Sequence, residues 1–133
     1  MAGSFLDTNV LLYLASHDAS KAERAEALVA EGGTISVQVL NEMAHVARRK
    51  MALTWTETTQ MVSAVRALMT VTPLTEATHV EGLRLSERYG LSVYDGQIVA
   101  AALNAGCDVL WSEDMHDGLL VDGRLRVTNP FAA

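Results

Sequence analysis

Four acidic residues of this sequence stand beside apolar segments, where a carboxylate needs a physical reason. Asp7 and Asp114 each follow a short apolar run, whereas Glu42 and Asp95 lie on the apolar faces of helical patterns. A carboxylate in such a place can cap a helix, or it can bind a hard cation such as Mg²⁺, which assists the hydrolysis of phosphate esters. Which role applies depends on the elements that position these side chains.

The stretch SVYDGQIVAAAL shows the ambiguity most clearly. Its acid, Asp95, leads an apolar stripe at helical spacing that consists of Ile98, Val99, Ala102 and Leu103. The spacing Ser92-x-x-Asp95 fits a loose capping box, and an acid in a first turn also suits the helix dipole. Each of the other three acids has an ordinary explanation too, as a helix cap (Asp7), a solvated edge residue (Glu42) or a loop residue (Asp114).

Composition restricts the class of protein. The 133 residues are 50% hydrophobic, so they can form one domain, residues 1–133, with a core that needs no disulfide or metal. The single cysteine, Cys107, cannot form an internal disulfide, which favours a reducing compartment. No apolar run approaches the ~18 residues of a membrane span, and the first residues do not resemble a signal peptide. We therefore expect a soluble cytoplasmic protein without a membrane partner.

The charge balance argues against capture of nucleic acid by the whole surface. The formal net charge is −6, from 16 acidic residues against 10 Lys and Arg. The one basic cluster, Arg48-Arg49-Lys50, closes a predicted helix, where it compensates the helix dipole; Arg48 and Arg49 could also guide a phosphate backbone. Aromatic residues make up only 5% of the chain, which leaves little material for a base-stacking platform.

Short apolar runs alternate with longer helical patterns along the chain. The predicted strands are residues 4–6, 34–36, 71–74, 109–111 and 125–127, the last of which alternates as an edge strand does. The predicted helices cover residues 10–16, 20–32, 37–51, 54–69, 76–89 and 92–105, with capping boxes at Ser20-x-x-Glu23 and Thr54-x-x-Glu57. This order predicts an α/β sandwich with a mainly parallel sheet, whose ligands bind beyond the carboxyl ends of the strands.

That frame gathers the acids. Asp7 and Asp114 follow strands and should share the carboxyl edge of the sheet. Glu42 has Val39 and Val46 as face neighbours and should point inward, as should Asp95. The helix of Asp95 can begin near either edge of the sheet, however, because the loop before it decides that.

Four segments carrying these acids resemble a known family. FLDTNVLLY from Phe5, VLNE from Val39, YDGQIVAAA from Tyr94 and WSEDM from Trp111 look, in this order, like the four motifs of the PIN-domain family. They are most similar to those of VapC-type toxin ribonucleases of type II toxin–antitoxin systems. The resemblance covers nearly the whole chain and implies a three-layer α/β/α sandwich with a mainly parallel sheet of about five strands.

The same resemblance implies an activity and its site. It implies an endoribonuclease that hydrolyses RNA with Mg²⁺ or Mn²⁺, with Asp7, Glu42, Asp95 and Asp114 as catalytic residues and metal ligands. It gives supporting roles to Thr8, Asn9 and Ser112, and leaves Asp117, at a variable position of the family, as a possible fifth acid. It also implies a cognate antitoxin protein and a homodimer.

Other classes of function are compatible with parts of the sequence. Glu42-x-x-His45 and Glu76-x-x-His79 could belong to a di-iron carboxylate site in a helical bundle, which a β-sheet would exclude. A phosphoacceptor receiver domain would need a lysine late in the sequence to contact the phosphoryl group, whereas the only lysines are Lys21 and Lys50. A non-catalytic PIN-like binding module would be expected to lack one of the four acids.

His116, near Asp114, needs no role beyond that of a solvated loop residue. The target RNA does not follow from the sequence.

Overall fold

The computed structural model describes residues 3–132 and contains a six-stranded sheet. The strand order is β3-β2-β1-β4-β6-β5, and every pair is parallel except β5 with β6. The strands are β1 (Ser4–Leu6), β2 (Thr34–Ser36), β3 (Thr70–Thr72), β4 (Val109–Trp111), β5 (Leu120–Val121) and β6 (Leu125–Thr128).

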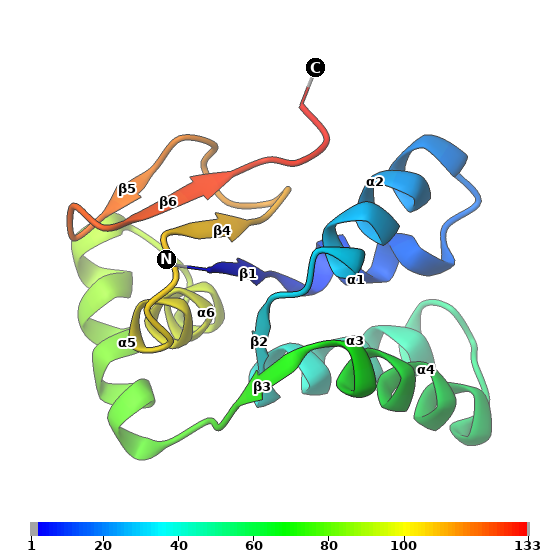
Figure 1. The fold of residues 1–133 in the computed structure, drawn as a ribbon. Coiled ribbons are helices and arrows are strands. Elements are labelled where there is room, and N and C mark those ends of the chain that lie inside the picture. Colours follow the sequence, from blue (N-terminus) through cyan, green and yellow to red (C-terminus); the bar gives the residue numbers. More distant parts are fainter. Residues whose placement is uncertain (1–2, 133) are drawn as a thin grey trace.

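Helices cover both faces of this sheet (Figure 1). Helices α5 and α6 lie side by side on one face, and α1 to α4 cover the other. The helices are α1 (Thr8–Leu12), the 3-10 helix η1 (Tyr13–Ala15), α2 (Ala19–Ala30), α3 (Val37–Arg49), α4 (Trp55–Leu68), α5 (Glu76–Tyr89) and α6 (Val93–Asn104). The predicted three-layer α/β/α sandwich is confirmed, and the sheet excludes a di-iron helical bundle.

The C-terminal part of the sheet differs from the prediction. Residues 125–127 were predicted as an edge strand, which is wrong, because β6 lies between β4 and β5. The true edge is the two-residue strand β5, which is too short to show any hydrophobic period. Asp122 and Gly123, both with positive φ (49° and 67°), form the tight turn that joins β5 to β6. The sheet therefore has six strands rather than about five.

Several element boundaries also differ from the prediction, among them the start of the first helix, which is Thr8 rather than residue 10. The helix predicted from Ser20 begins at Ala19, since the side chain of Asp18 caps it by accepting from the Lys21 amide at 3.2 Å. The strand predicted over 71–74 spans residues 70–72, because Pro73 has no amide hydrogen for a further ladder bond. The predicted capping box of Thr54 and Glu57 is present at the start of α4.

Strand β1 sits at the centre of the core and fixes where the chain leaves the sheet. Phe5 and Leu6 are fully buried, and Leu6 is in register with Trp111 on β4. The Asp7 amide continues this ladder by donating to the Trp111 carbonyl at 2.9 Å. The residues that follow β1 and β4 are therefore neighbours at the carboxyl edge of the sheet.

Two glycines set the close approach of α5 and α6. Gly82 on α5 and Gly96 on α6 face the partner helix, and a Cβ at Gly96 would overlap the Ser86 hydroxyl and the Gly82 carbonyl. Ser86 is itself held in place, since it donates to the Gly82 carbonyl at 2.8 Å and to the Ser92 carbonyl at 3.0 Å. The contact holds the first turn of α6, and with it Asp95, against α5.

Gly96→Ala is expected to destabilise the protein by about 1–3 kcal/mol, the cost of overfilling a close-packed contact. Helix propensity alone would act in the opposite direction, because Ala is favoured over Gly within a helix by up to ~1 kcal/mol. The sign of the change in urea unfolding free energy therefore decides between the two effects. Gly3→Ala is the matched control, since its Cβ would meet nothing within 4 Å. A Gly96→Ala protein as stable as the control would contradict the tight crossing.

No helix in the described residues has the length and apolar character needed to cross a membrane.

Candidate active site

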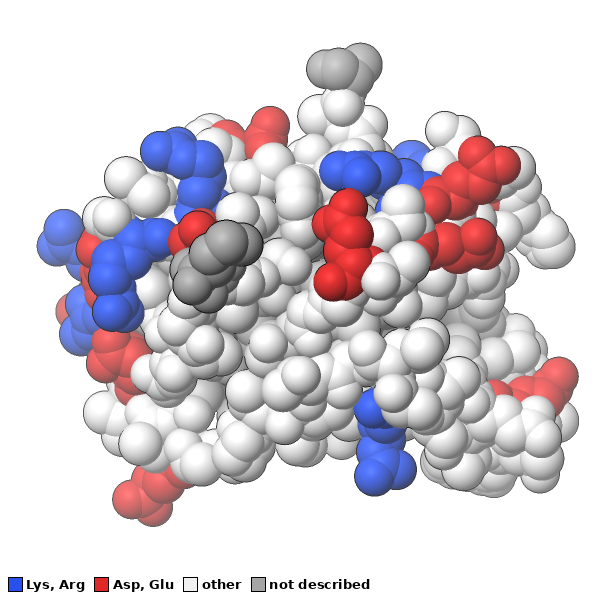
Figure 2. All heavy atoms as spheres, in the orientation of Figure 1, with Lys and Arg blue, Asp and Glu red and all other residues white. Residues whose placement is uncertain are grey.

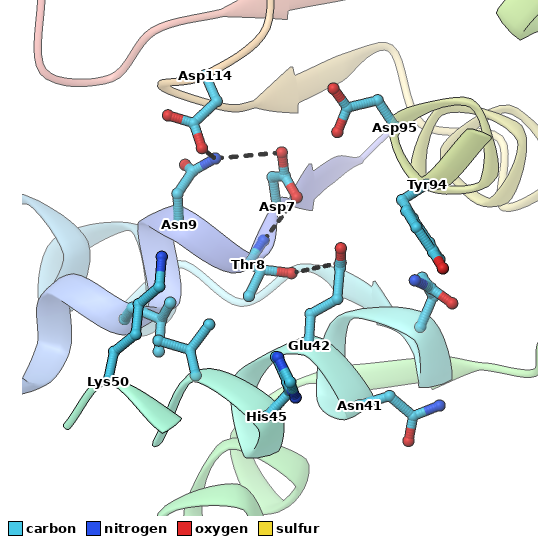
Figure 3. A pocket seen from close by; sticks show the side chains of 13 residues that line it. Asp7, Thr8, Asn9, Asn41, Glu42, His45, Lys50, Tyr94, Asp95 and Asp114 are labelled. Atoms are coloured by element: carbon cyan, nitrogen blue, oxygen red, sulfur yellow. Dashed lines mark hydrogen bonds between the residues drawn. The ribbon is translucent and has the colours of Figure 1, made fainter. Parts of the chain in front are cut away.

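A cavity of about 630 Å³ opens at the carboxyl edge of the sheet, and all four acids line it. Figure 3 shows their origins: Asp7 follows β1, Glu42 comes from α3, Asp95 from the first turn of α6, and Asp114 from the loop after β4. The structure thus brings together side chains that are far apart in the sequence.

Asp7 caps a helix and belongs to the cavity at the same time. Its carboxylate accepts from the Thr8 amide at 2.7 Å, which caps α1, and from the Ser112 hydroxyl at 2.8 Å. The residue is only 4% exposed. The capping explanation of Asp7 is therefore correct, but it does not exclude a role in the cavity.

Asn9 connects the two acids that follow the strands. Its side-chain amide donates to Asp7 Oδ2 at 3.2 Å and to Asp114 Oδ2 at 3.3 Å. Its carbonyl oxygen accepts from the Glu113 amide at 3.0 Å. Asn9 therefore holds the loop after β4 against α1 and keeps the carboxylates of Asp7 and Asp114 close to each other.

Glu42 is half-buried in the wall of the cavity that α3 forms. The Thr8 hydroxyl donates to Glu42 Oε2 at 2.9 Å, so the residue after Asp7 fixes the position of the Glu42 carboxylate. Burial, more than any other cause, raises the pKa of Glu42, and the negative charge of Asp95 adds to the increase.

Asp95 does not use its carboxylate as a helix cap. Ser92 caps α6, because its hydroxyl accepts from the Asp95 amide at 3.0 Å. The Asp95 carboxylate is directed into the cavity (Figure 3). Burial raises its pKa, and the negative charge of Asp114 raises it further. The question posed by SVYDGQIVAAAL is thereby resolved, since the serine serves the helix and leaves the acid free.

The electrostatics of the cavity are unfavourable as they stand. Burial raises the pKa of Asp7 to about 7, against hydrogen bonds from Ser112 and Thr8 that lower it, and the charges of Asp95 and Glu42 raise it further. Like-charged carboxylates that converge in a partly buried cavity repel one another. A bound cation would remove this cost.

The donor set fits a hard divalent ion. Carboxylate oxygens are the ligands that Mg²⁺ and Mn²⁺ prefer, and no soft ligand lines the cavity. Within residues 3–132, no three Asp, Glu, His or Cys side chains are grouped closely enough to form a ready-made metal site. An ion held by one or two carboxylates that keeps several waters matches the usual binding of Mg²⁺.

The predicted supporting residues lie around the acids in different ways. Thr8 and Asn9 line the cavity, whereas Ser112 is buried behind Asp7, to which it donates. Asp117 does not line the cavity; its carboxylate accepts from the Asn129 amide at 2.8 Å. The structure therefore places Asp117 apart from the other acids. His116 is exposed and also lies outside the cavity.

The basic residue at the cavity is not one that the sequence analysis favoured. Arg48 donates to the Leu53 carbonyl at 2.8 Å and its guanidinium lies 4.3 Å from the centre of the Trp55 ring. Neither Arg48 nor Arg49 lines the cavity, whereas Lys50 does. Of the three basic residues at the end of α3, only Lys50 is therefore placed at the cavity.

Other lining residues were missed although the sequence carried a signal for them. Gln38, Asn41 and His45 line the cavity together with Glu42. Their spacing from Gln38 is i+3, i+4 and i+7, which places all four on one face of α3. Tyr94, next to Asp95, completes this side of the cavity.

A second cavity, of about 750 Å³, adjoins the first. The two share Asn9, Leu12, Val46 and Asp114, and Met51 and Leu53 add apolar walls to the second. Glu113 lies at its border, where it pairs with Lys21 at 2.7 Å. The acid site therefore continues into a larger and more apolar hollow.

Charges on the face seen in Figure 2 do not form one basic surface. Lys and Arg side chains gather at its left edge together with acidic side chains, and in this part of the molecule Arg84 pairs with both Glu81 and Asp122. The centre of this face carries few charges. Among the described residues, this face therefore carries no continuous basic patch that could capture nucleic acid by charge alone.

The fold is shared by solved toxin–antitoxin structures. A toxin–antitoxin complex from Klebsiella pneumoniae has a TM-score of 0.73 and 19% identity, with 98% of this chain and 99% of that chain covered. A DNA-bound VapBC from Salmonella typhimurium has a TM-score of 0.71 and 17% identity, with 98% and 99% covered. A VapC toxin of Mycobacterium tuberculosis that cleaves the sarcin–ricin loop has a TM-score of 0.69 and 18% identity, with 84% and 89% covered. At these identities the likeness shows the fold.

Sequence comparison gives the family. No curated protein matches the chain significantly. The family model of the PIN domain, in contrast, matches residues 4–116, which include the four acids that converge at the cavity. The resemblance seen in the four sequence motifs is thus confirmed, and the chain belongs to the PIN-domain family.

Proposed function

We propose that the protein is an endoribonuclease that depends on Mg²⁺ or Mn²⁺ and acts as the toxin of a toxin–antitoxin pair. The observation that carries the proposal is the convergence of Asp7, Glu42, Asp95 and Asp114 in one cavity. The family and the toxins among the similar structures support it. A non-catalytic binding module is the alternative, but nothing about such a module would require four mutually repelling carboxylates.

In this proposal the ion would bind among Asp7, Glu42, Asp95 and Asp114, with one or two of these carboxylates as direct ligands. When bound, the divalent ion supplies a water of lowered pKa and neutralises charge that develops on the phosphate. Asn9 keeps the carboxylates of Asp7 and Asp114 together, and the hydroxyls of Thr8 and Ser112 fix the orientation of Glu42 and Asp7. Such hydrogen bonds to ligand carboxylates commonly contribute to metal affinity.

The cavity also offers binding groups to a polypeptide inhibitor. The similar structures include toxin–antitoxin complexes, and we extend the proposal to a cognate antitoxin. An antitoxin arginine would bind the carboxylates through its planar fork and displace the ion. The adjoining hollow, with Leu12, Met51 and Leu53, would receive an apolar side chain of the same segment.

A homodimer is part of the proposal as well. Sedimentation of the purified protein at micromolar concentrations tests it, and a monomer under these conditions would count against it. Unimpaired growth of cells that express the protein strongly, without a partner, would count against the role as a toxin.

The ribonuclease proposal is tested by incubating purified protein with total cellular RNA and mapping the cut ends. Cleavage is expected at defined positions with Mg²⁺ or Mn²⁺ and is expected to stop in excess EDTA. Persistent cleavage in EDTA would contradict the metal dependence. An absence of cleavage with either ion, in protein shown to be folded, would favour the binding module.

Lys50→Ala is expected to weaken RNA binding and to reduce its dependence on salt. One lost phosphate contact lowers the slope of log K against log salt concentration by about 0.7 for a single strand. Titrations of a labelled oligoribonucleotide at several salt concentrations measure this slope. Arg66→Ala removes one exposed positive charge from α4, outside the cavity, and is the matched control. Equal slopes for the Lys50→Ala protein and the control would contradict a phosphate contact of Lys50.

A further inference from the structure

Tyr94 is an exposed aromatic side chain at the mouth of the acidic cavity. It precedes Asp95 in the first turn of α6, and 65% of it is accessible to solvent although it lines the cavity. The buried face of α6 begins only at Gly96, so the helix does not need this ring for its packing. An aromatic surface is thus presented next to a carboxylate that belongs to the site.

Charged and neutral side chains are distributed unevenly around the Tyr94 ring. In Figure 3, Tyr94 and Lys50 lie on opposite sides of the acids, and α3 runs between them with Asn41, Glu42 and His45. The side near Tyr94 carries one carboxylate, Asp95, beside groups without formal charge such as Asn41, whereas the other three carboxylates lie towards the Lys50 side. A neutral ligand group can therefore lie against the Tyr94 ring, and a phosphate suits the carboxylates, where a cation would bind, and the Lys50 side.

An RNA strand carries both kinds of group, charged phosphates and neutral bases. Its phosphates need positive charge, and its unpaired bases present neutral rings that stack on aromatic side chains. The volume of about 630 Å³ lies within the range of ~300–1,000 Å³ typical of small-ligand pockets. The cavity can therefore accept one extruded nucleotide in addition to the phosphate at the acids.

We propose that Tyr94 and Asn41 form a subsite for one unpaired nucleobase beside the phosphate that is cleaved. This inference rests on the proposed ribonuclease function and adds to it the place where a base of the substrate is recognised. The Tyr94 ring provides the stacking surface, and the exposed Asn41 amide, with one acceptor and two donors, can pair with a base edge. The substrate at this subsite must be single-stranded or a loop, because a paired base cannot reach the ring.

The test uses a fluorescein-labelled single-stranded oligoribonucleotide of mixed sequence, titrated in Mg²⁺ by anisotropy, with its integrity followed on a gel. Tyr94→Ala is expected to weaken binding by about fivefold to 150-fold, the usual range for loss of one base–aromatic stack. Tyr94→Phe keeps the ring and is expected to bind within about twofold of the unaltered protein. Trp55→Ala is the control, because Trp55 is 68% exposed but lies outside the cavity.

A second readout separates binding from stability and chemistry. Tyr94→Ala is expected to keep the melting temperature of the unaltered protein and to raise KM for cleavage while kcat changes little, as for loss of uniform binding. A duplex of the same sequence should be insensitive to the change at Tyr94.

Two results would overturn the subsite. One is unchanged binding by Tyr94→Ala, and the other is an equal loss in Tyr94→Phe and Tyr94→Ala, which would exclude stacking as the cause. Cleavage of total RNA by the unaltered protein is measured in parallel. Absence of that cleavage contradicts the proposed function, whereas normal cleavage with unchanged binding by Tyr94→Ala contradicts the subsite alone.

Discussion

Asp95→Asn is expected to lower the rate of RNA cleavage by about 10²–10³-fold, the scale observed when one preorganised electrostatic group is removed from an active site. The substitution keeps the size of the side chain and leaves the cap of α6 intact, because Ser92 makes that hydrogen bond. It removes one negative charge from the group that would hold the ion. Initial rates on a fixed RNA substrate at saturating Mn²⁺ measure the effect.

Asp108→Asn provides the matched control for this substitution. Asp108 is an exposed acid that lies outside the cavity, so the same change in charge and shape should leave the rate unaltered. Cleavage by Asp95→Asn at the rate of the control would return Asp95 to a purely structural role in the first turn of α6.

The metal-free protein is expected to lose stability as the pH rises from about 4 to about 7. The pKa of Asp7 is about 7 in the folded protein, above its usual value of 3.8, because burial disfavours the charged carboxylate. The folded state therefore holds a proton that the unfolded chain releases in this range, and stability falls with rising pH. The difference corresponds to on the order of 4 kcal/mol, lost progressively between these two pH values.

Urea unfolding in EDTA across this pH range measures the loss, and Asp7→Asn is expected to flatten the curve. Above pH 7, addition of Mn²⁺ should restore stability to the unaltered protein, by about 2.7 kcal/mol at a hundredfold excess over its dissociation constant. Asp7→Asn should gain much less. Stability that rises between pH 4 and 7 in the metal-free protein and is unaffected by Asp7→Asn would contradict the strained carboxylate.

The position of two acids could be predicted from the order of strands alone. Asp7 and Asp114 follow parallel strands, and the carboxyl ends of such strands share one edge of the sheet. The bridge made by Asn9 could not be predicted, since it depends on the register of Leu6 with Trp111, across about a hundred residues of sequence. Register is set by the packed sheet as a whole, not by a local pattern.

The approach of Asp95 also required the structure. Helical periodicity showed that Asp95 points inward, but not which edge of the sheet its helix would start from. The contact of Gly96 with Gly82 and Ser86 on α5 fixes that start. The sequence pattern for a cap was correct as well, yet it could not show that Ser92 alone provides the cap and leaves the carboxylate unused.

Helix ends and very short strands were the least predictable features. Periodicity does not specify where a side chain points once the helix has ended, so Lys50, which follows α3, could not be distinguished from Arg48 and Arg49 as the residue at the cavity. Strand β5 has two residues and its pairing depends on the turn at Asp122. Longer elements such as α5 were found over the predicted residues, 76–89.

The most direct test of the account follows Mn²⁺ binding and RNA cleavage in the same titration. The electron paramagnetic resonance signal of free Mn²⁺ reports how much ion is bound, and aliquots taken at each concentration give the cleavage rate. The account predicts that the rate rises in proportion to bound Mn²⁺, and that Asp7→Asn loses both together. Full cleavage before any Mn²⁺ is bound, or equal binding and cleavage by Asp7→Asn, would contradict a metal-dependent ribonuclease built on these four acids.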